Sequence, residues 1–302
     1  MRPSTVVLTC DGEIARGDER RAARALAVQA VRVLTGSWSP VRLRSRAGRR
    51  PLGTQDGRRV WVSWSHSRQG VAAAASTRPV GVDIEACRPL REPGPIAERL
   101  ATAGLAGRAG EPCSVLDGWV ALESGLKALG VGLALPLRRV RFRDAALELD
   151  GRATGLRRTA LPGHGRLHHT SVVHHGTPAD LVHVVARSAG PVPDHHLDGA
   201  RPGAVPSFPL STTSTQEEVM AVALDKEELR HLIADTIDQD VEDVTDEASF
   251  TDDLDVDSLM ALEVTMVLER RYKVKLKEER LPEVTSLQAA YNLLSEELEK
   301  TA

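Results

Sequence analysis

Aromatic residues and cysteines are scarce in this 302-residue chain: aromatics make up 3% of it, and there are three cysteines. Cys10, Cys87 and Cys113 are widely spaced and odd in number, which argues against a disulfide framework and against a cysteine-ligated metal site. The chain has no run of 18 apolar residues, and its first residues lack the apolar core of a signal peptide. We therefore expect a soluble, cytoplasmic protein with no membrane partner. Its hydrophobic content of 41% is ordinary for a globular chain.

Charged residues are distributed unevenly along the chain. Residues 1–216 contain 29 Arg and one Lys against 18 acidic residues, a net charge of +12. Residues 217–302 contain nine basic residues against 24 acidic ones, a net charge of −15. A nucleic acid would suit the basic part but not the acidic part joined to it, so we expect no nucleic-acid partner. A phosphate-rich ligand together with an acidic protein partner accounts for both parts.

A segment rich in Pro, Gly, Ser and Thr, residues 189–224, separates the two parts and has neither helical nor strand periodicity. We predict a flexible linker there, with one domain at 1–188 and another at 225–302. In the first domain, helical patterns at 18–35 and 114–130 alternate with strand patterns, so we predict an α+β fold. The same order of elements before and after the middle of the domain indicates two similar halves. Strand patterns occupy 60–65, 70–76, 79–85, 138–144, 146–151, 167–175 and 181–187.

The acidic domain has the pattern of a small helical bundle. We predict helices at 225–237, 258–272 and 285–299, with a long acidic loop after the first and a turn or short helix at 277–282. In the second of these helices, one face is expected to form the core. That face carries Val264, Val267, Leu268 and Tyr272.

The opposite face of the same helix carries Leu259, Glu263, Met266 and Arg270. Exposed Leu and Met side chains on an acidic helix are unfavourable unless a partner docks there. Ser258 begins the helix, where backbone N–H groups and the macrodipole favour a phosphodiester. The alternative is that Asp257 and Ser258 only cap the helix.

The acidic domain resembles the acyl carrier protein family over residues 220–302. The matching segments are the acidic loop, LDVDSLMALEV, ERRYKVKL and TSLQAAYNLL. The resemblance implies a four-helix bundle in which Ser258 carries a 4′-phosphopantetheine arm for acyl groups. It also implies that Leu259, Glu263 and Met266 are recognised by partner enzymes, among them acyl-loading and synthase enzymes of polyketide, fatty acid or related biosynthesis.

In the basic domain, the strand pattern VGVDIE places the carboxylates of Asp83 and Glu85 on one face, because side chains alternate along a strand. Mg²⁺ binds to a few protein carboxylates together with water and substrate phosphates, so this pair suits it. The alternative is an edge strand with solvated acids. Val82 and Ile84 point to the other face, which we expect to be buried.

A second pair of charged residues, Glu123 and Lys127, lies one helical turn apart in WVALESGLKALG. The pair could be a surface ion pair, but Lys127 is the only lysine in the first 225 residues. An ammonium group serves a transferring phosphate differently from a guanidinium. Ser65 and His66 end a strand pattern, and Arg50 precedes Pro51 at a predicted turn. A histidine near basic residues can bind phosphate or be purely structural.

Residues 18–187 resemble the surfactin-type 4′-phosphopantetheinyl transferases, with GRRP, VSWSHS, VGVDIEACRPL and WVALESGLKALGVGLALPL in the family's order. The resemblance implies a pseudo-dimeric fold in which coenzyme A and Mg²⁺ bind between the two halves. It further implies that Glu123 and Lys127 are catalytic, with Glu123 taking the proton of the attacking serine. Metal ligands by the same resemblance are Asp83, Glu85 and Glu123. Coenzyme A contacts are Arg24, Arg50, Ser65, His66 and Lys127.

The reaction implied by both resemblances is transfer of 4′-phosphopantetheine from coenzyme A to Ser258, within one chain or between chains. The chain departs from the transferase family in two places. Leu122 stands where the family usually has a lysine, and restoring that lysine is expected to add charge near the phosphates. The segment before the first helix is short, which predicts a trimmed first sheet.

Two alternatives remain open. The first is a carrier with a degenerate transferase domain that only docks partners, which Leu122 favours. The second is a metal-dependent nuclease site, which the acidic domain disfavours by repelling nucleic acid.

Overall fold

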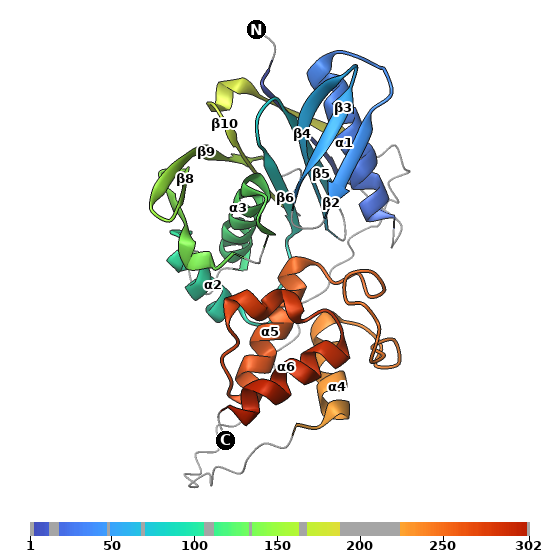
Figure 1. The fold of residues 1–302 in the computed structure, drawn as a ribbon, viewed down its shortest axis with the longest axis vertical. Helices are drawn as coiled ribbons and strands as arrows, with labels where there is room; N and C mark the ends of the chain where they lie inside the picture. Colours follow the sequence, from blue (N-terminus) through green and yellow to red (C-terminus); the bar gives the residue numbers. More distant parts are fainter. Residues whose placement is uncertain are drawn as a thin grey trace, which may run out of the picture.

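A computed structural model describes residues 3–11, 18–46, 49–67, 70–105, 112–132, 135–162, 168–187 and 224–300. Residues 3–187 form two β-sheets with helices and are called the N-terminal part; residues 224–300 are called the C-terminal bundle (Figure 1). The mixed helix and sheet content predicted from the sequence is confirmed. The predicted linker lies outside the described residues except for Leu224. Within the described ranges, no helix is both long and apolar enough to cross a membrane.

The first sheet has six strands in the order β11-β1-β5-β4-β3-β2, and α1 packs against it. The predicted trimming of this sheet is wrong, because β1 precedes α1 and lies between β5 and β11. Strand β11 comes from the far end of the N-terminal part and pairs with β1 in parallel. The elements are β1 (Thr5–Asp11), α1 (Glu19–Thr35), β2 (Arg42–Arg46), β3 (Arg49–Gln55), β4 (Arg58–Ser67), β5 (Gly70–Ser76) and β11 (Leu181–Arg187).

The second sheet has five strands in the order β6-β10-β9-β8-β7. The order β1-β5-β4-β3-β2 in the first sheet repeats it strand for strand, and all these neighbours are antiparallel. The two halves of the N-terminal part therefore share one topology. The elements are β6 (Gly81–Ala86), α2 (Pro93–Thr102), α3 (Pro112–Leu129), η2 (Leu137–Arg139), β7 (Val140–Arg143), β8 (Ala146–Leu149), β9 (Arg152–Leu161), β10 (His168–His175) and η4 (Pro178–Asp180).

Strand β6 lies where the two halves meet. The Val82 N–H donates to Ser63 Oγ of β4 at 3.0 Å. Helix α3 also packs against β6. Gly81 allows α3 to approach closely, because a Cβ there would lie 2.0 Å from the Ser124 carbonyl oxygen and 2.5 Å from the Ala128 nitrogen. The missing side chain therefore sets the distance between α3 and β6.

Gly81→Ala is expected to destabilise the protein by about 3 kcal/mol, the upper end of the usual cost of overpacking, because both clashing atoms are backbone. Gly53→Ala is the matched control: its Cβ would first meet a methyl group of Val31 at 3.2 Å, which can shift. Denaturant unfolding of both variants measures the difference. Equal stability of the two variants would contradict the close approach of α3 to β6.

Four helices build the C-terminal bundle, and side chains cap the three α-helices. Asp225 caps α4 through the Glu227 and Glu228 N–H groups, and Ser286 caps α6. The bundle has its own apolar core, which includes Phe250, Val264, Leu268 and Tyr272. Val267 is buried but lies outside that core cluster. The helices are α4 (Lys226–Ile237), α5 (Ser258–Tyr272), η5 (Glu278–Glu283) and α6 (Leu287–Glu299).

Candidate functional site

A cluster of three buried carboxylates lies at the junction of the two halves. Asp83 and Glu85 come from β6, and Glu123 comes from α3; one oxygen of each lies within 4.8 Å of the others. Their exposed fractions are 0%, 4% and 8%. Strand β6 is an edge strand of its sheet, as the alternative held, but its acids are not solvated, because α3 covers this face of β6.

Lys127 and Ser65 hold one oxygen of Asp83. Asp83 Oδ1 accepts hydrogen bonds from Lys127 Nζ and Ser65 Oγ, both at 2.6 Å. Lys127 Nζ also lies 3.7 Å from Glu123 Oε2, one helical turn away. Asp83 Oδ2 is buried and has no hydrogen-bond partner among the described residues. One lysine therefore faces three carboxylates, and one of their oxygens is left for a further ligand.

Burial and mutual repulsion shift the pKa values of these groups. The pKa of Asp83 rises to about 7, chiefly by burial; Lys127 opposes the rise and Glu123 adds to it. The pKa of Glu85 lies well above its ordinary value because of burial and the charges of Asp257 and Asp83. Burial lowers the pKa of Lys127, but Asp83 and Glu123 outweigh it and raise the pKa overall. The cluster is thus short of positive charge.

The hydroxyl of Ser258 reaches this cluster from the C-terminal bundle. Its Oγ donates to Glu123 Oε1 at 2.8 Å, across 135 positions of sequence. Ser258 is the first residue of α5, and the N-cap is Asp257, whose Oδ1 accepts from the Met260 N–H at 2.7 Å. The capping role therefore belongs to Asp257, and the serine hydroxyl is free to point at Glu123.

Ion pairs join arginines of the N-terminal part to acids of the C-terminal bundle. Glu263, which is 1% exposed, pairs with Arg88 at 2.7 Å and accepts from the Arg91 backbone N–H at 2.7 Å. Exposed pairs contribute little, whereas removal of Arg88 would leave the buried Glu263 carboxylate without its ion-pair partner and would be strongly destabilising. In a pair with the charges exchanged, Arg270 of the bundle lies 2.6 Å from Glu92 of the N-terminal part. Further pairs are Arg20–Asp252 (2.7 Å), Arg91–Asp235 (2.8 Å), Arg99–Glu269 (3.4 Å) and Arg138–Glu279 (3.2 Å).

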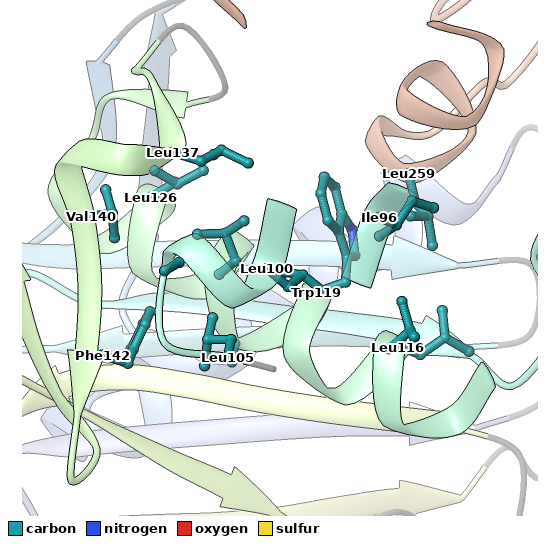
Figure 2. Packing of buried hydrophobic residues seen from close by; sticks show 14 of the residues in the cluster. Ile96, Leu100, Leu105, Leu116, Trp119, Leu126, Leu137, Val140, Phe142 and Leu259 are labelled. Atoms are coloured by element: carbon teal, nitrogen blue, oxygen red, sulfur yellow. The ribbon is translucent and has the colours of Figure 1, made fainter. Parts of the chain in front are cut away.

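The apolar face of α5 packs into the N-terminal part. Leu259 and Met266 are 0% and 3% exposed and belong to the same buried cluster as Ile96 and Trp119. Figure 2 shows Leu259 reaching from α5 to Ile96 of α2. The face of α5 that would be unfavourable in water is therefore covered by the other part of the same chain.

A cavity of about 1020 Å³ lies beside Ser258 and is lined by both parts of the chain. Its lining includes the basic residues Arg20, Arg24 and Arg50, together with the apolar Leu137 of the N-terminal part and Leu281 of the bundle. A cavity of this size and polarity suits a ligand with both anionic and apolar portions.

All five predicted coenzyme A contacts line this cavity: Ser65 and Lys127, which are bonded to Asp83, and Arg24, Arg50 and His66, whose environments differ. Arg50 lies in β3, not at a turn, and it donates to the Ala128 and Leu129 carbonyl oxygens at 2.6 and 2.5 Å. It therefore holds the C-terminal end of α3. Arg24 is exposed and donates to the Leu43 carbonyl oxygen at 3.3 Å. His66 has a lowered pKa, chiefly from burial and then from Lys127 and Arg20.

Leu122 does not lie in the cavity lining. It is 0% exposed and belongs to the apolar cluster beneath α3. Successive residues of a helix point about 100° apart, so the neighbour of Glu123 faces the core. The prediction that a lysine at this position would add charge near the phosphates stays a prediction, and the burial of Leu122 counts against it, because an ammonium group is unfavourable in an apolar cluster.

Sequence reasoning did not single out Arg88 or Arg91, and it took Asp257 only as a cap. The charge difference between the two parts predicted attraction but not its partners. Arg88 lies three residues after Glu85 in VGVDIEACRPL, so an arginine close behind the carboxylate strand was the available signal. Asp257 differs from an ordinary helix cap only in the residues that surround it in the folded chain. The spacing of residues in the sequence does not identify those neighbours.

Comparison with known proteins gives matches to the C-terminal bundle. Residues 227–294 match the family described as Phosphopantetheine attachment site. The chain is 56% identical over 84 residues to Polyketide-8 synthase acyl carrier protein 2 of Streptomyces avermitilis, covering 28% of this chain and 97% of that protein. It is 43% identical over 72 residues to an acyl carrier protein of Petrotoga mobilis, covering 24% of this chain and 85% of the relative.

Among solved structures, the chain is similar to a holo acyl carrier protein from Geobacter metallireducens. The identity is 24%, the match covers 25% of this chain and 87% of that one, and the TM-score is 0.23. None of these three matches covers more than 28% of the chain.

Proposed function

Because the C-terminal bundle of this chain belongs to the acyl carrier protein family, we propose that the N-terminal part is a 4′-phosphopantetheinyl transferase that modifies this bundle at Ser258. Coenzyme A is the donor, and adenosine 3′,5′-bisphosphate is the second product. The single observation that carries the proposal is the 2.8 Å hydrogen bond from Ser258 Oγ to Glu123. Capping of α5 does not require this bond, because Asp257 caps the helix, whereas a nucleophile must lie beside a base.

The carboxylate cluster fits a magnesium ion. Asp83, Glu85 and Glu123 offer the hard oxygen ligands that Mg²⁺ prefers. Asp83 Oδ2 is buried without a hydrogen-bond partner, and an unpaired buried carboxylate oxygen is unfavourable unless a ligand binds it. The pKa values of Asp83 and Glu85 are raised by burial first and by neighbouring carboxylates second, and a bound cation would favour their ionised forms. When bound, magnesium supplies charge that neutralises the diphosphate as its bridging bond breaks.

The serine and Glu123 carry out the proton transfer. Glu123 Oε1 accepts the Ser258 hydroxyl proton as Oγ forms a bond to the phosphorus that bears pantetheine. The bond from that phosphorus to the diphosphate bridging oxygen breaks, and adenosine 3′,5′-bisphosphate leaves. Lys127 is held between Asp83 and Ser65 and presents its ammonium group to the cavity.

The cavity supports coenzyme A as the donor. Its lining combines arginines, Arg20 and Arg24, which suit the phosphates, with leucines, Leu137 and Leu281, which suit the pantetheine arm. We propose that the modified bundle then serves polyketide synthase enzymes, since a relative with 56% identity is a polyketide synthase acyl carrier protein.

Intact mass spectrometry tests the proposed activity. The purified chain is expected to gain the mass of one phosphopantetheine group when coenzyme A and Mg²⁺ are added, and to gain nothing with either alone. A chain whose Ser258 is unmodified, and which stays unmodified with both present, would leave the N-terminal part as a docking domain only.

A further inference from the structure

The C-terminal bundle brings its own carboxylate, that of Asp257, to the wall of the cavity that contains Glu85 and Glu123. Asp257 immediately precedes Ser258, whose Oγ touches Glu123. Its Oδ1 accepts a hydrogen bond from the Met260 N–H at 2.7 Å. The capping bond therefore holds this side chain at the wall of the cavity.

We propose that Asp257 is a shared element of the cation site, so that one divalent cation is held between the carboxylates of the N-terminal part and the carrier's own Asp257. The inference rests on the proposed function, because it takes the cluster of Asp83, Glu85 and Glu123 as the cation site. Asp257 lies outside the group of carboxylates whose oxygens are within 4.8 Å of one another, so it acts through a water ligand of the cation; Mg²⁺ keeps several waters in protein sites.

The charges around Asp257 support this assignment. The groups that face it are Glu85, Glu123 and Glu263, which are acidic, and Arg88, which is basic. Arg88 is already paired with Glu263 at 2.7 Å. Burial, opposed by its capping bond and by Arg88, raises the pKa of Asp257. Docking thus adds a carboxylate to a cluster that already lacks positive charge.

A second observation points to a ligand at this place. Asp83, 0% exposed, has an oxygen without any hydrogen-bond partner among the described residues. Lys127, the nearest cation, is bonded to the other oxygen of Asp83. A divalent cation would satisfy the orphaned oxygen and offset the repulsion between Asp257 and its acidic neighbours. Cation binding and docking of the bundle then stabilise each other by the same factor.

The variant Asp257→Asn tests the inference, because it removes the charge of this side chain and keeps its capping role. Asparagine caps helices as well as aspartate does, so α5 keeps its first hydrogen bond while the charge is lost. Titration calorimetry of the full chain with MgCl₂ is expected to show about a tenfold weaker binding in this variant, typical for loss of an outer partner of a metal site. Asp235→Asn is the control, because Asp235 is an exposed interface acid that pairs with Arg91. Its Mg²⁺ affinity is expected within twofold of the wild type.

Asp83→Asn distinguishes failure of this inference from failure of the proposed function. If Asp83→Asn loses Mg²⁺ binding and Asp257→Asn binds as tightly as the wild type, Asp257 is only a cap and the inference is overturned. If Asp83→Asn binds Mg²⁺ normally, the cation site of the proposed function is wrong as well. Thermal melting gives a second readout: added Mg²⁺ is expected to raise the melting temperature of the wild type more than that of Asp257→Asn.

Discussion

Ser258→Ala is expected to abolish the mass gain of one phosphopantetheine completely, since the hydroxyl that touches Glu123 is the proposed nucleophile. The helix itself should survive the change, because Asp257 caps α5 and Ser258 does not. Intact mass after incubation with coenzyme A and Mg²⁺ measures the effect.

Ser286→Ala is the control for this variant. Ser286 also stands at a helix start in the same bundle, and its Oγ accepts from the Ala289 N–H at 3.2 Å. Loss of this cap is expected to cost about 1 kcal/mol of stability but to leave the mass gain intact. A mass gain in Ser258→Ala would show that another residue is the attachment site.

Glu123→Gln is expected to slow transfer by about 10²- to 10⁴-fold, the usual contribution of a general base. Glutamine is nearly the same size and can still accept the Ser258 hydrogen bond, but it cannot take the proton. It also removes one anionic oxygen from the carboxylate cluster. Single-turnover rates at saturating coenzyme A and Mg²⁺ measure the loss.

Glu98→Gln serves as the matched control, because Glu98 is an exposed glutamate of α2 outside the carboxylate cluster. Its transfer rate should equal that of the wild type. A Glu123→Gln chain that retained most of the wild-type rate would remove Glu123 from the proposed chemistry, while the role of Ser258 would still stand on its own test.

Much of the fold could be predicted because the hydrophobic patterns of individual elements are local. Strands β4, β5, β10 and β11 and helices α1, α3, α4 and α5 lie close to the predicted ranges. Strand β1 (TVVLTCD) was missed despite an apolar run, whereas two other missed strands have weak patterns of their own. Strand β9 (Arg152–Leu161) is largely polar, and β3 begins with two arginines before a proline, which reads as a turn. Both strands form because neighbouring strands pair with them.

The candidate site could be predicted only in part, for a similar physical reason. Asp83 with Glu85, and Glu123 with Lys127, are near neighbours along a strand and a helix, so their spacing identifies each pair. Their meeting depends on Gly81, whose importance arises from the backbone atoms of α3 that lie beside it. The contact between Ser258 and Glu123 spans 135 positions, and no local pattern encodes it.

The buried face of α5 limits the order of events in which the bundle can take part. Leu259, Glu263 and Met266 are between 0% and 3% exposed against the N-terminal part. Any enzyme that grips the bundle by this face must wait until the bundle has left. Under the proposed function, modification of Ser258 and use of the carrier by other enzymes are therefore separate in time, and the lifetime of the docked state limits how fast those enzymes can use the carrier.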